Sequence, residues 1–222
     1  MSIKYQNPRF NPDELSVHNI DKMAVSAVDN NSEVLDIGCA TGFMGKYLQQ
    51  VKHCNVFGVD LRSAEIEIAK QNLNFAMVGN IEDTRIVTSI LSNHENKKFD
   101  CVLATSLIEH VSDPDKVIMN MKRLLKPNGK IILSTPNISH WAVIVSLLKG
   151  DFTYTDYGIL DRTHLHFFTI KTFRELFVNN NVQIEKLLVD AEGGGFPRLS
   201  LALVHFFPNL FVYQILIIGR MK

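Results

Sequence analysis

The stretch Glu33 to Gly45, EVLDIGCATGFMG, decides the fold of this chain. Its first part, Glu33 to Ile37, is a short apolar run that Gly38 ends, and apolar residues then recur with helical period from Phe43 to Val51. This order predicts a strand, a glycine loop and a helix. Glycines in such a loop let the backbone approach a ligand, and the amides at the helix start face it, so an anionic group is expected there.

The loop departs from two well-known phosphate-binding patterns. A dinucleotide fingerprint, GxGxxG, needs glycine at positions 40 and 43, where this chain has Ala40 and Phe43. A P-loop needs a GK[ST] string, and none follows the loop. Both interpretations are therefore weakened.

Apolar runs and helical patterns alternate on both sides of this unit. Strands are expected at Glu33 to Ile37, Asn55 to Asp60, Phe75 to Val78, Phe99 to Thr105 and Lys130 to Ser134. Helices are expected at Ser63 to Leu73, within Asp83 to Leu91, and at Asp113 to Leu125, where Pro127 and Gly129 close the last one. Such alternation predicts a parallel sheet with helices on both faces and a ligand site beyond the carboxyl ends of the strands.

The flanking segments have a different rhythm. Asn11, Pro12, Asp13 and Glu14 form a helix start, which predicts one amphipathic helix over 12–30. After the core, 33–137, we expect an insertion over the sheet at 138–168, helical from Ile138 to Leu148 and polar and aromatic beyond. A helix from Thr169 to Asn179, a strand from Val182 to Val189 and a last strand from Phe211 to Ile218 complete a single domain, 1–222, with Gly193 to Gly195 opening the final loop.

Composition excludes several function classes. Lys plus Arg equals Asp plus Glu at 23 each, so no overall field favours nucleic acid or an anionic membrane as the main partner. Cys39, Cys54 and Cys101 are odd in number and widely spaced, which indicates a reducing compartment rather than disulfides or zinc.

The two ends of the chain bear on its location. The N-terminus has no apolar run behind its charges, so no signal peptide is expected and the localisation is predicted to be cytoplasmic. Leu199 to Ile218 approaches spanning length but contains polar residues and Pro208, which argues against a transmembrane helix and leaves peripheral membrane contact open.

Asp60 ends the second expected strand. From that position a carboxylate can accept hydrogen bonds from both hydroxyls of a ribose, as in a bound nucleoside. It could equally cap the helix that starts near Ser63. The glycine loop nearby favours the ribose.

The motifs VLDIGCATG, VFGVDLR, GNIED, FDCVLATSLIEHVSDPDKVI and LLKPNGKIILSTPN follow one another between Glu33 and Asn137. As a set they resemble the class I S-adenosylmethionine (SAM)-dependent methyltransferases, in the branch of ubiquinone-biosynthesis O-methyltransferases and polysaccharide-cluster methyltransferases. The resemblance implies an α/β, Rossmann-like, mostly parallel seven-stranded sheet with helices on both faces and an antiparallel last strand. It also implies SAM as the cofactor.

The resemblance implies a role for each matching position. Asp36 would hold the methionine ammonium, and the backbone from Gly38 to Gly42 would pass close to the methionine moiety. Asp60 would bind the ribose. The other implied contacts are Leu61 against adenine, Asn80 and the Ile81 backbone beside the adenine amino group, and Thr105 and Ser106 facing the sulfonium and methyl group. Asn80 stands where the family usually has Asp.

Methyl transfer from SAM needs alignment and sometimes a base, so histidines near the strand ends are the catalytic candidates. His110 lies in LIEHVSDP, where Glu109 and His110 could instead organise the loop. His164 and His166 alternate in LDRTHLHFF and would face opposite ways on an extended segment, and we favour His164.

Some ubiquinone-pathway relatives bind a divalent metal through an ExxEH motif. Ser106 replaces the first acid here, and Glu109 with His110 alone would make a poor site, so we predict metal independence.

The acceptor is expected to be a small molecule, a sugar or a lipid-linked compound, methylated on a hydroxyl oxygen. Aromatic residues after the core offer stacking surface: Trp141, Phe152, Tyr154, Tyr157, Phe167 and Phe168. The segments PNISHWAVIVSLLKGDFTYTDYGILDRTHLHFFT and FFPNLFVYQ resemble methyltransferases of surface-polysaccharide synthesis. A sugar hydroxyl is therefore the leading hypothesis and a quinone-type phenol the second. A SAM-binding scaffold without turnover and a nicotinamide-dependent oxidoreductase are the other hypotheses.

Overall fold

The structure is a computed structural model that describes residues 7, 9–193 and 197–221. In this part of the chain one seven-stranded sheet has the order β3-β2-β1-β4-β5-β7-β6. The strands are β1 (Glu33–Ile37), β2 (Asn55–Asp60), β3 (Phe75–Val78), β4 (Phe99–Thr105), β5 (Leu125–Pro136), β6 (Gln183–Asp190) and β7 (Gln214–Arg220). Only β7 runs antiparallel, to both β5 and β6. The predicted fold class is confirmed.

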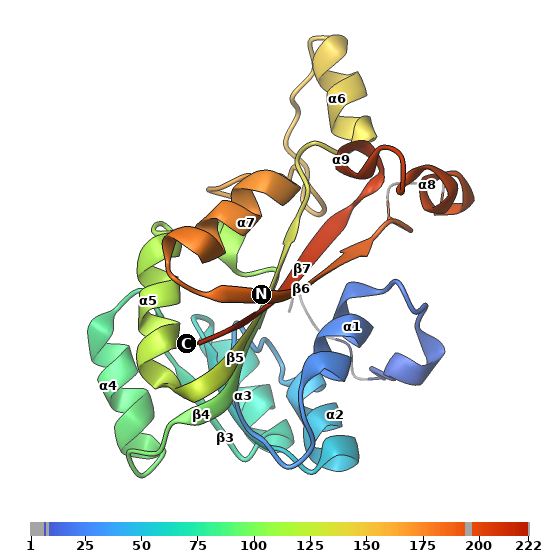
Figure 1. The fold of residues 1–222 in the computed structure, drawn as a ribbon. Coiled ribbons are helices and arrows are strands. Elements are labelled where there is room, and N and C mark those ends of the chain that lie inside the picture. Colours follow the sequence, from blue (N-terminus) through green and yellow to red (C-terminus); the bar gives the residue numbers. More distant parts are fainter. Residues whose placement is uncertain (1–6, 8, 194–196, 222) are drawn as a thin grey trace.

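Two layers of helices cover the sheet, as Figure 1 shows. One face carries α1 (Ile20–Ala27), α2 (Phe43–Lys52) and α3 (Ser63–Asn72), and its core includes Ala24, Leu48 and Ile66. The other carries α4 (Thr84–Asn93), α5 (Pro114–Leu124) and α7 (Ile170–Asn179), over a core that includes Ile118 and Phe173. The chain therefore buries both faces of the sheet, as a mostly parallel sheet requires.

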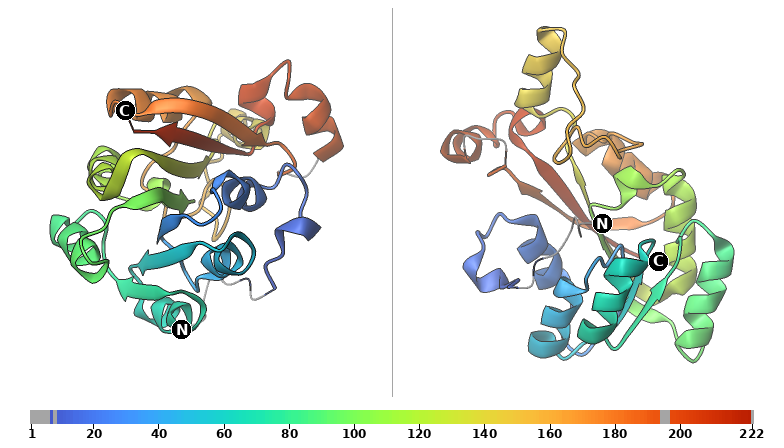
Figure 2. Two further views of the ribbon diagram at one scale, coloured as in Figure 1. Left: turned by 60° about the horizontal axis from the view of Figure 1, so that its bottom comes forward. Right: turned by 180° about the vertical axis from the view of Figure 1, so that it is seen from behind.

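Three further helices lie away from these two layers. They are α6 (Trp141–Leu148), α8 (Pro197–Leu203) and α9 (Pro208–Phe211). Figures 1 and 2 show α6 standing off from the sheet at the end where α8 and α9 also lie. No helix in the described ranges is long and apolar enough to cross a membrane.

The glycine loop lies at the switch point of the sheet. The strands β1 and β4 are neighbours in the sheet. From β1 the chain continues to β2 and β3 on one side of the sheet, and from β4 it continues to β5 on the other side. In such sheets a crevice opens at this point. Gly38 and Gly42 have φ of 75° and 76°, a conformation that glycine adopts without strain.

Leu73 fills a socket with glycine walls. A Cβ atom added at Gly42, Gly45 or Gly58 would lie 2.8, 2.4 or 2.5 Å from a side-chain atom of Leu73. These glycines come from the loop, from α2 and from β2, so one side chain sets how closely the three segments approach one another. The socket thereby determines the position of the loop.

The predicted N-terminal helix over 12–30 is wrong. The structure has a 3-10 turn, η1 (Pro12–Glu14), and then the separate helix α1. Asn19 causes the break, because its side chain accepts hydrogen bonds from the Asp21 and Lys22 amides and so caps a new helix start. The cap predicted at Asn11 is present, but it starts only η1.

Two strand boundaries also differ from the prediction. β5 begins at Leu125 rather than Lys130, because Leu125 pairs with Phe99 and a bulge follows this pair. The expected turn at Pro127 and Gly129 is therefore part of the strand. The last strand begins at Gln214 rather than Phe211, since Pro208 starts the short helix α9. The predicted loop between β6 and β7 contains α8 and α9, and of Gly193 to Gly195 only Gly193 lies within the described residues.

All three cysteines are buried and free.

The glycine socket generates a stability prediction. Gly45→Ala should lower the free energy of unfolding by roughly 1–3 kcal/mol, because the added methyl overpacks against Leu73 although alanine favours helix. In a Leu73→Ala background the same change should destabilise the protein much less. Denaturant unfolding of the four proteins in this double-mutant cycle measures the coupling, and equal effects in both backgrounds would contradict the socket.

Candidate functional site

A cavity of about 650 Å³ opens at the carboxyl ends of β1, β2 and β4. It lies where the switch point predicts a ligand. Ten of the predicted site residues line it: Asp36, Gly38, Asp60, Leu61, Asn80, Ile81, Thr105, Ser106, His110 and His164. Gly42 is the exception, since it faces Leu73 instead and acts on the loop's position.

Asp60 connects the end of β2 to the glycine loop. Its Oδ2 accepts a hydrogen bond from the Ala40 amide at 2.9 Å, and its Oδ1 accepts from the Arg62 amide and Nε at 3.0 and 3.2 Å. The capping role that competed with ribose binding is thus partly real, because one of these bonds closes the turn before α3. A carboxylate has about four acceptor positions, so capacity remains for at least one hydroxyl.

The segment after β3 forms another part of the cavity wall. Asn80 lies in a turn in which its Oδ1 accepts the Glu82 amide at 2.9 Å. Ile81 is buried and its carbonyl accepts from Asn120, which fixes the backbone beside the cavity. Leu61 also lines the cavity and is 63% exposed. An apolar side chain exposed at a cavity mouth is available to cover a flat ring.

Asp36 and Asp21 bring two acids to the same cavity. Burial raises the pKa of Asp36 to about 7, with a further increase from the negative charges of Asp60 and Asp21. Burial likewise raises the pKa of Asp21 to about 6, helped by Asp190. Elevated carboxyl pKa values of this kind occur at functional sites. Sequence analysis missed Asp21, because nothing in its helix start signals contact with the cavity.

Ser106 has a strained backbone at the end of β4. Its φ of 48° is unusual for a residue other than glycine. Hydrogen bonds from its amide to the Ser134 carbonyl and hydroxyl, at 3.2 and 3.0 Å, hold this conformation. Strain of this kind is concentrated at functional sites. The Ser106 hydroxyl accepts from Gln214 at 3.4 Å, which brings β7 to the same point.

The two predicted histidines meet in the lining of the cavity. The ring centroids of His110 and His164 are 4.7 Å apart. His164 is buried, and its Nδ1 lies 3.0 Å from the Ile159 carbonyl. His166 points elsewhere, with Nε2 at 3.2 Å from the Ser112 carbonyl, and does not line the cavity. The alternation of the two rings is therefore as expected.

The LDRTH string positions His110. Asp161 is buried and accepts from both the Thr163 amide and hydroxyl, at 2.9 and 2.7 Å. Because the Thr163 hydroxyl donates to Asp161, its oxygen accepts from His110 Nδ1 at 3.1 Å. The Thr163 carbonyl lies 3.2 Å from the same nitrogen. Neutral His110 thus carries its proton on Nδ1, which makes Nε2 its basic atom.

Glu109 precedes His110 in the turn after β4 and is 1% exposed. Neither of its carboxylate oxygens meets the distance and angle of a normal hydrogen bond among the described residues. Burial raises the pKa of Glu109 to about 8, although the nearby Thr135 hydroxyl acts in the opposite direction. Ligand atoms of Glu109, His110 and His164 all lie within 4.8 Å of one another. The metal-independence prediction counted only the first two, and the structure adds His164 from the insertion as a third candidate ligand.

The expected aromatic acceptor surface is largely absent from the cavity wall. Tyr157 is the one residue of the six that lines it, together with the polar Asp161, Thr163 and Gln214. Phe168 belongs to the core. The sequence could not tell which of the six aromatic residues would reach the cavity, because most of the insertion lacks the periodic pattern of a helix or a strand.

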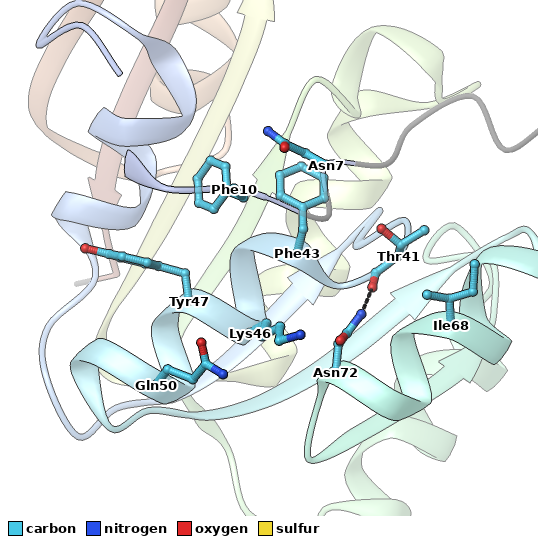
Figure 3. Close-up of a pocket in the computed structure, with 9 residues that line it drawn as sticks. All are labelled: Asn7, Phe10, Thr41, Phe43, Lys46, Tyr47, Gln50, Ile68 and Asn72. Carbon is cyan, nitrogen blue, oxygen red and sulfur yellow. Dashed lines mark hydrogen bonds between the residues drawn. The ribbon is translucent and has the colours of Figure 1, made fainter. Parts of the chain in front are cut away.

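A second, smaller cleft of about 190 Å³ lies on the outer side of α2 (Figure 3). Lys46, Tyr47 and Gln50 line it from α2, and the Asn72 side chain donates a hydrogen bond to the Thr41 carbonyl at 2.8 Å. Phe10 packs edge-on against Phe43, with ring centroids 5.1 Å apart. Phe43 lines both hollows, so this cleft marks where the N-terminal segment covers the outer face of the glycine loop.

Fold and cavity together define a doubly wound α/β protein with its ligand site at the switch point. A family model described as a methyltransferase domain matches residues 9–187. The chain therefore belongs to the class I SAM-dependent methyltransferases, whose cofactor is SAM.

Named relatives agree with this assignment. A ubiquinone biosynthesis O-methyltransferase from Acinetobacter baylyi is 25% identical over 153 residues, 66% of this chain and 62% of the relative. One from Pseudomonas aeruginosa is 31% identical over 141 residues, 61% of this chain and 60% of the relative. The chain thus spans less than two thirds of the length of these curated relatives.

A solved structure shares the fold. It is that of magnesium protoporphyrin IX methyltransferase from Synechocystis PCC 6803 with bound S-adenosylhomocysteine (SAH). The two structures superpose with a TM-score of 0.60 at 15% identity, over 90% of this chain and 78% of that one.

The buried acid Asp36 generates a pH prediction. A carboxyl whose pKa rises from 3.8 to about 7 on folding holds its proton more tightly in the folded state than in the unfolded state. The folded state therefore loses stability relative to the unfolded state as the pH rises from 3.8 to about 7. Asp36→Asn cannot ionise. Its gain in unfolding free energy over the native protein should grow from pH 4 to 7 and reach on the order of 2–4 kcal/mol.

Thermal or urea unfolding from pH 4 to 8, without ligand, measures this difference. Asp13→Asn on the exposed η1 turn is the control and should track the native protein. A constant offset between Asp36→Asn and the native protein at all pH values would contradict the role of burial.

Proposed function

We propose that this protein transfers the methyl group of SAM to a hydroxyl oxygen of a small, polar acceptor. One observation carries the proposal: a single cavity joins Asp36 and Asp60 at the cofactor end to His110 and His164 at the other. A nucleoside with an amino-acid side chain suits the first end, because one carboxylate can accept ribose hydroxyls and another a cationic amine. The fold family supplies the identity of that ligand.

The chain's own residues then align and deprotonate the acceptor. Bound SAM would supply an electrophilic methyl group, with S-adenosylhomocysteine, a neutral thioether, as the leaving group. The acceptor hydroxyl lies with its oxygen toward Ser106 and its proton toward the histidine pair. Nε2 of His110 or of His164 takes the proton as the carbon–oxygen bond forms, so the methyl ether product is neutral. The imidazolium then releases its proton to water.

The acceptor end favours a hydroxylated molecule. Asp161, Thr163 and Gln214 offer polar contacts, and Tyr157 offers one aromatic face. This combination supports a sugar hydroxyl, because a sugar presents several hydroxyls and one apolar face. The names of the relatives support a second candidate, a phenol of the kind found in ubiquinone precursors.

The same end of the molecule exposes apolar side chains. Leu147 and Leu148 on α6 are 47% and 82% exposed, and Phe206 and Phe207 between α8 and α9 are 76% and 56% exposed. These residues support peripheral contact with a membrane that carries a lipid-linked acceptor.

The histidine assignment is testable with a matched pair of variants. His164→Gln and His110→Gln should each lower kcat by about 10²- to 10⁴-fold, because each removes a basic nitrogen from the acceptor end. His166→Gln, in the same loop but outside the cavity, should stay within about twofold of the native enzyme. Transfer of labelled methyl from SAM to a panel of nucleotide sugars and catechols measures these rates and ranks the two acceptor classes.

Equal rates for all three variants would exclude a histidine base. Transfer to no acceptor by a protein that binds S-adenosylhomocysteine (SAH) would instead favour the scaffold hypothesis.

We propose that the reaction proceeds without a metal, although Glu109, His110 and His164 have the donor types of a transition-metal site. These three residues would hold such an ion, which would supply a Lewis acid for the acceptor oxygen. The proton-transfer route needs none, since both histidines already line the cavity. EDTA should therefore change the rate by less than about twofold. Loss of activity that zinc or manganese restores would overturn this prediction.

A further inference from the structure

Asp21 reaches the cavity from a segment outside the cofactor motifs. It is the second residue of α1, where the Asn19 side chain accepts its amide at 3.0 Å and the Lys22 amide at 3.1 Å. This cap fixes the first turn of the helix, and α1 packs through Ala24 and Val25 in the core on its face of the sheet. The Asp21 side chain therefore has a defined place beside Asp36 in the cavity wall.

Neither carboxylate has a cationic partner in the described part of the chain. Asp36 is 3% exposed, lines the cavity, and makes no hydrogen bond or ion pair with its side chain there. The side chain of Asp21 is half-buried, lines the same cavity, and likewise makes no hydrogen bond or ion pair among the described residues. The lysine next to it is committed elsewhere, because Lys22 Nζ donates to the Leu15 carbonyl at 2.9 Å. A buried, unpartnered carboxylate directed at a cavity indicates a ligand that supplies the missing donor.

The charges around the pair are mostly negative. Asp60 faces it from β2 but is paired with Arg62, whose Nε lies 3.2 Å away. Asp190 approaches from the end of β6, where His18 and Glu192 act on it and Tyr213 lies nearby. The pKa values of Asp21, Asp36 and Asp190 are all raised, Asp21 and Asp36 partly by acid neighbours. A cation bound between Asp21 and Asp36 would relieve this repulsion.

We propose that Asp21 is a second carboxylate, with Asp36, for the ammonium group of the bound cofactor. The inference rests on the proposed function and deepens it. SAM and SAH share that ammonium, whereas only SAM carries a positive sulfur. Asp60 lies at the ribose end, so the amino-acid portion extends toward Asp36 and α1. Asp36 on β1 and Asp21 on α1 then hold one amine between them. The helix α1 thereby becomes part of the cofactor site.

Calorimetric titration of Asp21→Asn tests this assignment. The variant keeps the shape of the side chain and removes a destabilised charge, so it should fold at least as well as the native protein. SAH should bind about 10- to 100-fold more weakly, because a charge-assisted contact is lost. Binding of 5′-methylthioadenosine, which has no amino-acid portion, should change by less than twofold. Asp13→Asn is the control for an acid in the same segment and should leave both affinities unchanged.

Proton exchange gives a second measurement that does not depend on the loss of affinity. A cation lowers the pKa of the carboxyls that bind it, so SAH binding at pH 6.5 should release protons, and Asp21→Asn should release fewer. Titrations in buffers of different ionisation enthalpy count them.

Several results would overturn the proposal. Unchanged SAH affinity of Asp21→Asn, or an equal loss for SAH and 5′-methylthioadenosine, would remove Asp21 from the amine. Tighter SAH binding would place it beside the ligand's carboxylate instead. If the native protein bound no SAH, the proposed function itself would fail, whereas native binding with an unaffected variant would reject only this inference.

Discussion

The packing of Leu73 against three glycines determines the geometry on which the site depends. Gly42, Gly45 and Gly58 lie in the loop, in α2 and in β2, and none could carry a side chain without overlapping Leu73. The close approach brings the Ala40 amide within 2.9 Å of Asp60 Oδ2. Loop and second strand are therefore tied together at the place where a nucleoside would bridge them. The rest of the cavity is arranged around this fixed edge.

A second constraint is the burial of acids without cations. Asp36, Asp21 and Glu109 all line one cavity, and burial raises the pKa of each. Such groups destabilise the free protein, because desolvation opposes ionisation. Their presence has a physical reason only if a ligand or a reaction uses them. The buried carboxyl of Glu109 and the absence of a cation for Asp36 among the described residues thus connect stability to function.

The insertion completes the site through its backbone and through one short motif. The Leu165 and His166 amides donate to the Glu109 carbonyl at 2.8 and 3.0 Å, which joins the insertion to the turn after β4. Asp161 orients Thr163, and Thr163 orients His110. A histidine next to the core is thereby positioned by residues more than 50 places further along the chain. Strand ends therefore hold Asp36 and Asp60, whereas a short turn and a loop hold the two histidines.

The sequence by itself determined the strands β1 to β4, the fold class and the lining of the cofactor end. These features depend on local signals: apolar runs of strand length, glycines at a turn, and an acid at a strand end. Even there Gly42 differs, because its contact with Leu73 joins residues 31 positions apart.

Only the tertiary structure decided which distant side chains share the cavity. Asp21 comes from a helix whose start depends on the Asn19 cap, and His164 becomes a third candidate ligand through a segment with almost no regular structure. The bulge that lengthens β5 and the helices before β7 likewise follow from pairing and proline placement rather than from periodicity. Such contacts depend on how the elements pack, and no short stretch of sequence contains that information.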